Sequence, residues 1–242
     1  MSAERVLVIG AHSADFVWRA GGAVAVCAAG GGTAKVIALS YGERGESGEL
    51  WKDQDPAHPQ TIERVKEIRH GEAERAAAAL GAEFECLDFG DYPLEIDKDR
   101  LIEVADRIRE FAPDVLITHT DTDPFNPDHP VAYHAVSRAR TLAAGAGVAS
   151  ALGTVRPPAL HLFEPHQPEL CNFIPNTFLD ITAVFDKKVA AMSEMKAQQY
   201  LVSYYTERAG HRGNHARRSS GRSEIKQAEA FQRVTPHVVD AL

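Results

Sequence analysis

The sequence predicts an α/β protein with a Rossmann-like, three-layer α/β/α architecture and a mostly parallel sheet. Short runs rich in β-branched residues alternate along the chain with longer stretches of helical periodicity, as in a parallel sheet covered on both faces. The chain has 242 residues, of which 44% are hydrophobic and 25% charged, a composition that suits a folded core and excludes disordered and fibrous classes. We see no internal repeat or clear linker, so we expect residues 1–242 to form a single domain.

The expected strands are short, apolar and mostly followed by polar turns. They comprise residues 6–10, 35–40, 84–89, 115–119, 161–164 and 177–181. The expected helices comprise residues 16–29, 61–80, 99–111, 131–144, 186–207 and 223–232. Gly81 is expected to cap the second of these helices, because glycine is favoured just after a helix ends. Residues 41–60 are dense in Gly, Pro and charge and are expected to form a long functional loop.

Charge and cysteine usage restrict the classes of partner and compartment. Acidic residues outnumber basic ones, 34 to 26, which gives a net charge of −8 and disfavours general nucleic-acid binding or attachment to an anionic membrane. The three cysteines form no C-x-x-C pair, so a reducing compartment is favoured over a disulfide framework. The start of the chain lacks the pattern of a signal peptide, and no apolar stretch reaches the roughly 20 residues that span a bilayer. We therefore expect a cytoplasmic protein without nucleic-acid or membrane partners.

Polar side chains suited to metal binding or proton transfer follow four of the expected strands. In open α/β sheets, ligands bind outside the carboxyl ends of the strands, so these side chains are expected to converge on one cleft. The sequence contains no G-x-G-x-x-G motif after the first strand, no phosphate-binding loop motif and no G-x-S-x-G motif, which leaves nucleotide binding and serine hydrolysis without support. The four segments are residues 11–15, 41–47, 121–129 and 165–169.

A metal site is the leading interpretation of these segments. His12 and Asp15 are three residues apart at the expected start of a helix, and His129 in a distant loop would complete a His₂Asp site. Three protein ligands leave a position open for water or substrate, as in catalytic zinc sites. Alternatively, Asp15 or Ser13 caps the helix that begins at Phe16, and His129 is an ordinary turn residue.

Several motifs resemble those of the LmbE/PIG-L family of zinc-dependent deacetylases. The first is V-L-V-I-G-A-H-S-A-D, which aligns with the A-H-P-D-D motif of the family. The resemblance implies the same fold and a zinc ion held by His12, Asp15 and His129. The motifs that carry it are residues 6–15, Gly21 with Gly22, residues 126–129 and residues 228–231.

Two positions depart from the family pattern. The catalytic Asp of the family falls on Ala14, and the first His of its H-P-D-H motif falls on Asn126. Amide hydrolysis needs a base to activate water, and an alanine cannot serve as one. The longer motifs H-S-A-D-F-V-W-R-A-G-G, Y-G-E-R-G-E-S, D-P-F-N-P-D-H-P and F-E-P-H-Q-P-E instead resemble hydratases within this family. Those enzymes act on unsaturated oxo-tricarboxylates in gallate and protocatechuate degradation.

The resemblance also implies roles for the acid–base residues. Glu46 is expected to remove a proton from water, with Glu43 as the second choice, and His166 to deliver a proton to carbon. The sequence leaves open which of Glu46 and His166 removes the proton. Taken alone, the two glutamates would be interpreted as a solvated loop face. Asp128, next to His129, is expected to orient a metal ligand.

A substrate with three carboxylates needs local positive charge in an acidic chain. Residues 208–222 contain five Arg, two His and no acidic residue, and guanidinium groups suit carboxylate binding. We expect Arg212, together with Arg44 and Asn126, to bind substrate. The alternative is that residues 208–222 form a solvated basic loop.

Three functions are therefore compared. The leading hypothesis is a zinc-dependent hydratase, a hydro-lyase, that acts on a small tricarboxylate and assembles as a homo-oligomer. The alternative is a zinc-dependent N-acetyl deacetylase of amino-sugar conjugates, which the alanine at position 14 disfavours. The third hypothesis is a metal-binding module without catalytic activity. Manganese or iron would suit similar N and O donors.

Overall fold

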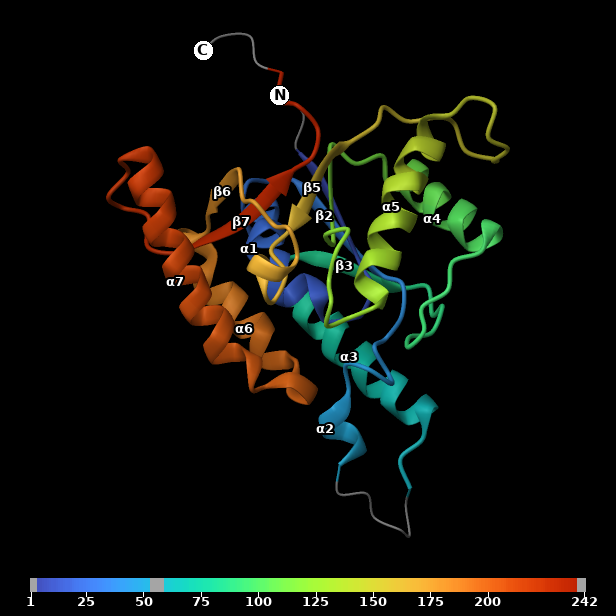
Figure 1. Cartoon of the computed structure of the whole chain (residues 1–242), viewed down its shortest axis with the longest axis horizontal. Coiled ribbons are helices and arrows are strands. Elements are labelled where there is room, and N and C mark those ends of the chain that lie inside the picture. The colour runs from blue at the N-terminus through green and yellow to red at the C-terminus, as the bar shows by residue number, and fades with distance from the viewer. Residues whose placement is uncertain (1–3, 53–58, 239–242) are drawn as a thin grey trace.

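A computed structural model describes residues 4–52 and 59–238 (Figure 1). Residues 53–58 of the expected long loop 41–60 lie outside the described residues. The strands are β1 (Arg5–Gly10), β2 (Thr33–Ala38), β3 (Ala82–Cys86), β4 (Val115–Thr118), β5 (Ala159–Phe163), β6 (Thr177–Asp180) and β7 (Ala228–Arg233). The helices are α1 (Asp15–Ala29), α2 (Gly48–Trp51), α3 (Ile62–Leu80), α4 (Lys98–Phe111), α5 (Asp128–Ala144), α6 (Phe185–Glu194) and α7 (Leu201–Ser220). Short 3₁₀ turns comprise Pro168–Leu170, Thr182–Val184 and Lys196–Gln198.

The seven strands form one sheet in the order β3-β2-β1-β4-β5-β7-β6. Strands β1 to β5 pair in parallel, whereas β7 is antiparallel to both β5 and β6. The predicted mostly parallel α/β/α fold is confirmed. The chain moves from β1 outward to β3 and then returns to place β4 on the other side of β1. This reversal creates a topological switch point between β1 and β4, where ligands bind in open α/β sheets.

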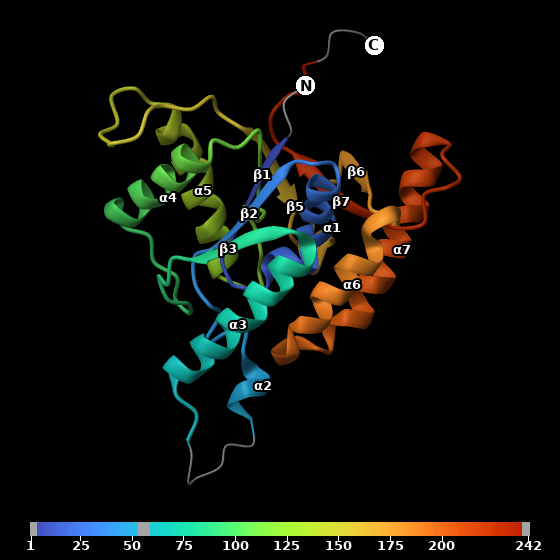
Figure 2. The same cartoon turned by 180° about the vertical axis from the view of Figure 1, so that it is seen from behind.

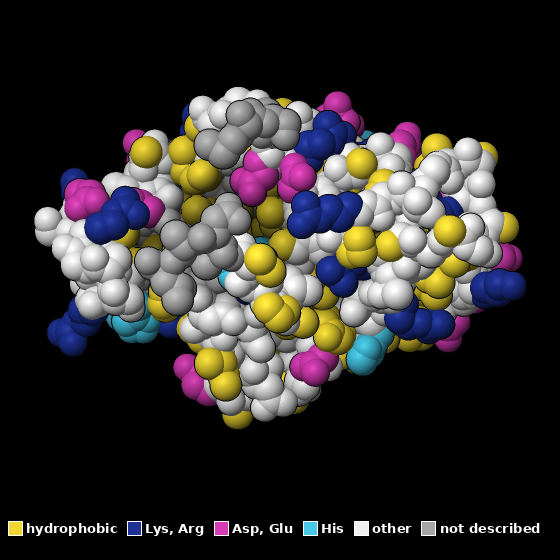
Figure 3. Space-filling model, turned by 90° about the horizontal axis from the view of Figure 1, so that it is seen from above, with side chains coloured by type: hydrophobic (Ala, Val, Ile, Leu, Met, Phe, Trp, Pro, Cys, Tyr) yellow, Lys and Arg dark blue, Asp and Glu magenta, His cyan; other side chains and the backbone are white. Residues whose placement is uncertain are grey.

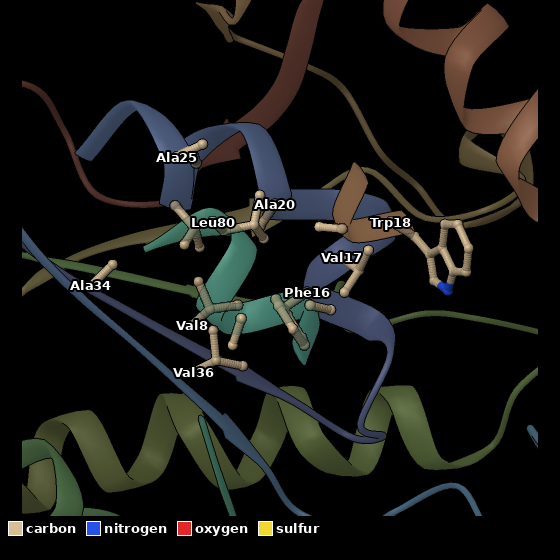
Figure 4. Close-up of a cluster of buried hydrophobic side chains, with 14 of the residues drawn as sticks. Val8, Phe16, Val17, Trp18, Ala20, Ala25, Ala34, Val36 and Leu80 are labelled. Atoms are coloured by element: carbon tan, nitrogen blue, oxygen red, sulfur yellow. The ribbon is translucent and has the colours of Figure 1, made fainter. Parts of the chain in front are cut away.

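Both faces of the sheet are buried, as the apolar strands require. Val8 of β1 packs with α1 and α3, whereas its neighbours Leu7 and Ile9 pack with α4 and α5 on the opposite face. Figure 2 shows the two groups of helices on either side of the sheet. In Figure 4, Val8 lies near Phe16 of α1 and Leu80 of α3. Gly81, with φ of 84°, caps α3 as predicted.

The helix predicted over residues 223–232 is wrong, because this segment contains strand β7. Sheet pairing overrides the helical pattern here, and Glu229 accounts for the tight fit of the strand against α1. Its two carboxyl oxygens accept hydrogen bonds from the backbone N–H groups of Gly22 (2.7 Å) and Ala23 (2.8 Å). Lys188 Nζ donates a further hydrogen bond to Glu229 Oε1 at 2.6 Å. A Cβ atom on Gly22 would lie only 2.9 Å from the Glu229 carboxyl group, which explains the need for glycine.

The continuous helix predicted over residues 186–207 is also wrong, because the chain breaks between α6 and α7. The break is stabilised by Glu72, whose side chain accepts a hydrogen bond from the backbone N–H of Ala197 at 2.9 Å. It allows Gln198 to turn inward, where it is 3% exposed. The break therefore positions a polar side chain beside the site described below.

None of the helices among the described residues combines the length and the apolar composition that a membrane crossing requires. Figure 3 shows the upper end of the molecule as oriented in Figure 1, where acidic, basic and hydrophobic side chains are intermingled. Charge is therefore not segregated on that face.

Candidate active site

A pocket of about 320 Å³ lies at the carboxyl ends of β1 and β4. The switch point of the sheet brings the loop after β1, the loop after β2 and the loop after β4 together here. The turn after β5 and the start of α7 complete the wall. The sequence-predicted residues that line the pocket are His12, Asp15, Glu46, Asn126, His129 and His166.

The three predicted metal ligands are buried together at one end of this pocket. The exposed fraction is 1% for His12, 5% for Asp15 and 2% for His129. One ligand atom from each lies within 4.8 Å of the others, so the group could hold a metal ion. The Nδ1 atom of His12 lies 3.5 Å from Asp15 Oδ2, and the Nε2 atom of His129 lies 3.6 Å from Asp15 Oδ1.

The hydrogen bonding of the two histidines fits a metal ion between them. His12 Nδ1 and His129 Nε2 are buried without a hydrogen-bond partner. A buried, unsatisfied polar atom costs about 1–3 kcal/mol, and a bound cation would satisfy both nitrogens at once. The capping alternative for α1 fails, because neither Asp15 nor Ser13 caps the helix; Ser13 Oγ donates to the backbone oxygen of Tyr41 instead.

The other nitrogen of each histidine is held by a carboxylate. His12 Nε2 lies 3.3 Å from Asp128 Oδ2, and His129 Nδ1 lies 2.7 Å from Asp123 Oδ2. Asp128 is itself fixed by the backbone N–H groups of Tyr92 and Leu94, both at 2.9 Å. Such carboxylate–histidine pairs orient metal ligands in known sites. Asp128 thus contacts His12 and not its sequence neighbour His129, which Asp123 orients.

The ionisation of the ligands reflects a cavity that favours cations. Burial alone lowers the pKa of His12, but Asp128, Asp15 and Glu46 outweigh it and raise the pKa to about 10. Burial likewise raises the pKa of Asp15, but His119, Arg19 and His129 hold it well below its usual range. Without metal, the site therefore binds a proton on His12 where a metal ion would supply the positive charge.

The second imidazole ligand is already in the form that binds metal. Burial lowers the pKa of His129 well below its usual range, and the neighbouring His119 and Arg19 lower it further. The rings of His119 and His129 stack with centroids 4.1 Å apart, which restricts the ring orientation of His129. A neutral imidazole is what metal coordination requires.

Glu46 faces the same pocket from the loop after β2. Its Oε1 atom lies 4.0 Å from His12 Nδ1, the nitrogen without a partner. Its carboxylate accepts hydrogen bonds from Asn126 Nδ2 at 2.6 Å and from Gln198 Nε2 at 2.9 Å. Asn126 Oδ1 in turn accepts the backbone N–H of Asp128 at 3.1 Å, so the amide holds Glu46 in place beside the ligands.

His166 also lines the pocket, from the turn after β5. Its ring stacks on Tyr204 with centroids 4.3 Å apart, and its Nδ1 atom lies 3.4 Å from the Tyr205 hydroxyl. Burial, Arg19 and Arg208 together lower the pKa of His166 to about 4. The imidazole is therefore neutral near pH 7 in the substrate-free protein.

Glu43 and Arg44 do not line the pocket, although they are close to Glu46 in sequence. The carboxylate of Asp91 accepts the backbone N–H groups of Arg44 and Gly45 and fixes a tight turn that directs only Glu46 inward. Glu43 is buried behind this turn, and burial raises its pKa. The half-exposed guanidinium of Arg44 donates to Glu43 Oε1 at 3.1 Å.

Arg212 also lies outside the pocket wall. Residues 208–220 belong to helix α7, so the alternative of a solvated basic loop is wrong for most of this segment. The guanidinium of Arg212 is paired with the buried carboxylate of Glu164, through Nε at 2.9 Å and through a second nitrogen. Arg208 also contacts Glu164, at 3.2 Å. Both cations are thus already paired within the protein.

Asp123, Gln198 and Arg19 are among the pocket residues that were not identified from the sequence. Asp123 orients His129, Gln198 positions Glu46, and Arg19 projects from α1 one turn after Asp15. Spacing could have indicated Arg19, since residues four apart share a helix face. Gln198 gave no local signal, because the break between α6 and α7 places it.

This fold and site define a PIG-L-type α/β protein with a candidate metal centre. The family model described as PIG-L, GlcNAc-PI de-N-acetylase, matches residues 7–140, and the chain belongs to this family. The family is metal-dependent.

The most informative similarities are to hydratases. The chain is 46% identical to 4-oxalmesaconate hydratase of Pseudomonas putida, over 99% of this chain and 92% of that protein. It also matches the crystal structure of GalB, the 4-carboxy-2-hydroxymuconate hydratase of P. putida KT2440, with a TM-score of 0.94, 45% identity and 99% of each chain covered. The N,N′-diacetylchitobiose deacetylase of Pyrococcus horikoshii shares the fold at 17% identity and a TM-score of 0.76, with 96% of this chain and 84% of that chain covered.

Proposed function

We propose that this chain is a zinc-dependent hydro-lyase that adds water to 4-oxalomesaconate or its enol tautomer, 4-carboxy-2-hydroxymuconate, in gallate or protocatechuate degradation. The observation that carries the proposal is the composition of the pocket. Glu46 and His166 face a buried His₂Asp group, whereas the family's deacetylase base is replaced by Ala14, a buried methyl group in the pocket wall. The similarity to the two hydratase proteins from P. putida supports the same reaction.

The residues His12, Asp15 and His129 would hold the metal ion. When bound, the ion supplies Lewis-acid stabilisation for the negative charge that develops on the oxo-carboxylate end of the substrate. We favour zinc because the donor set of two imidazoles and one carboxylate is that of catalytic zinc sites.

Hydration of the C=C bond needs one proton removed from water and one delivered to the neighbouring carbon. We assign the removal to the Glu46 carboxylate, which Asn126 and Gln198 hold 4.0 Å from His12 Nδ1. We assign the delivery to His166. Its pKa of about 4 in the free protein means that it must gain this proton after substrate binds, when substrate carboxylates offset the nearby arginine charges.

The direct test mixes purified, zinc-loaded protein with 4-carboxy-2-hydroxymuconate and follows loss of the conjugated chromophore. We expect turnover that disappears when the metal is removed and returns when zinc is added. An N-acetyl sugar conjugate serves as the alternative substrate. Release of its amine, without any change in the chromophore of the first substrate, would replace the hydratase proposal by a deacetylase.

The proposal extends to a cytoplasmic location and a homo-oligomeric state. The three cysteines are all free, in keeping with a reducing compartment. Cell fractionation tests the location, and light scattering of the purified protein tests the assembly.

A further inference from the structure

Arg19 is the one permanently charged cation among the described residues that line the pocket. The other ionisable groups in the wall are three carboxylates, three histidines and three tyrosine hydroxyls. The proposed substrate carries three carboxylates, and a single metal ion cannot engage all of them. We propose that Arg19 is a substrate-binding residue that holds a carboxylate other than the one at the metal. This inference rests on the proposed function and specifies how that pocket selects a polycarboxylate.

The position of Arg19 allows one ligand to reach it and the metal centre together. Asp15 opens α1 and Arg19 follows one turn later, which is a rise of about 6 Å along the helix. Its Nη1 atom donates to Asp15 Oδ1 at 3.2 Å and lies 3.2 Å from His119 Nδ1. The same pocket wall also includes His166 and Tyr205. A carboxylate at Arg19 would therefore lie beside Asp15, in the same pocket as the proposed proton donor.

The hydrogen bonding of Arg19 leaves capacity for a ligand. Its side chain is 8% exposed. The guanidinium also interacts with the Tyr205 hydroxyl, but its Nε atom is buried without a hydrogen-bond partner. A guanidinium has five N–H donors in a planar fork, and buried donors are nearly always paired. The guanidinium carbon lies 5.5 Å from the ring centroid of Phe163, which helps to hold the group in place. Arg19 is therefore a preorganised donor that the protein itself leaves partly unused.

A simpler interpretation is that Arg19 only offsets the charge of Asp15. That role would use Nη1 and would not account for the unpaired Nε atom. The two arginines predicted from the sequence to bind substrate are already paired with carboxylates of the protein. Arg212 pairs with Glu164, and Arg44 pairs with Glu43. Among the described residues that line the pocket, Arg19 is therefore the arginine that can meet a substrate carboxylate.

The test uses zinc-loaded protein and two inert probes, tricarballylate with three carboxylates and butyrate with one. Binding of each probe is measured by titration calorimetry. We expect Arg19→Met to lower the affinity for tricarballylate by about tenfold or more, since charge-assisted hydrogen bonds are the strong ones. The affinity for butyrate should change by less than about twofold, because its single carboxylate is expected to bind the metal ion and not Arg19. Arg75→Met is the matched control, because Arg75 is also a helical arginine paired with a carboxylate, that of Glu194, but is exposed and does not line the pocket.

Two outcomes would overturn the inference: equal weakening of both probes, which indicates damage to the metal site, or no weakening of either. Zinc content is measured for every variant. If Arg19→Met loses zinc, Arg19→Lys replaces it, because lysine keeps a charge beside Asp15 but lacks the Nε donor and the fork. An Arg19-dependent affinity for tricarballylate in a protein that does not turn over 4-carboxy-2-hydroxymuconate would support the carboxylate site and reject the proposed reaction.

Discussion

Two regions of the chain concentrate charge, and they contribute differently to the site. The His₂Asp group at the carboxyl ends of β1 and β4 combines residues from distant loops in one buried cluster. Helix α7 is richer in positive charge, yet Arg212 is paired with Glu164, and Arg217 donates to the backbone oxygen of Ile225 at 2.7 Å. Position at a strand end is therefore a better guide to the candidate site than local composition. Parallel strands direct their carboxyl ends to one edge, whereas a helix distributes its side chains around its axis.

Loss of a metal ligand should have the largest effect. His12→Ala removes one of the three proposed ligands and should lower both zinc content and turnover of 4-carboxy-2-hydroxymuconate to near background. Metal analysis measures the zinc content, and the chromophore assay measures the turnover. His134→Ala, at an exposed position on α5, is the control and should retain both. Full activity in metal-free protein would show that the cluster has no catalytic role.

Glu46→Gln should separate chemistry from metal binding. The amide keeps the shape of the side chain but cannot accept a proton, so kcat should fall by roughly 10²-fold or more with zinc still bound. Glu49→Gln, at an exposed position in α2, is the control. A rise in KM with unchanged kcat would instead make Glu46 a residue that binds substrate, and another group would be the base.

Metal binding should depend on pH through His12. The raised pKa of about 10 means that the metal-free protein carries a proton on His12 at pH 7, and this proton must leave when metal binds. Apparent metal affinity should therefore increase with pH below about 10, by up to about tenfold per pH unit for one released proton. Calorimetry in buffers of different ionisation enthalpy counts the protons.

The raised pKa of His12 should also make the stability of the metal-free protein depend on pH. A raised histidine pKa stabilises the metal-free fold fully below the unfolded value of 6.5, and this contribution is lost as the pH rises towards about 10. Denaturant unfolding of metal-free protein at several pH values measures the trend. His12→Gln should flatten it, and an unchanged trend in that variant would assign the titration to another group.

The smallest effect is expected in helix α7. Arg212→Met leaves Glu164 with Arg208 as a partner, so kcat/KM should stay within about twofold of the unsubstituted protein. Steady-state kinetics measures this. A rise in KM comparable to that of Arg19→Met would restore Arg212 as a substrate-binding residue and remove the contrast between the two regions.

The central fold was predictable because its signals are local. Buried parallel strands are continuous apolar runs, so β1, β2, β4 and β5 could be recognised from a few residues each. Strand β7 could not, because Ala228–Arg233 lacks that pattern and becomes a strand by pairing between β5 and β6. The break between α6 and α7 was missed for a related reason, since Glu72 stabilises it from a distant helix.

The sequence by itself determined the architecture, the grouping of His12, Asp15 and His129 as a candidate metal site, and the replacement of the usual base by Ala14. The first two follow from residue types within and just after the predicted strands, and the third follows from the resemblance to the deacetylase family. Only the tertiary structure decided which charges face the pocket. It buried Glu43 and turned Glu46 inward, paired Arg212 with Glu164, and left Arg19 with an unpaired donor beside the ligands. Ion pairing and burial depend on partners far apart in the chain, so no local pattern encodes them.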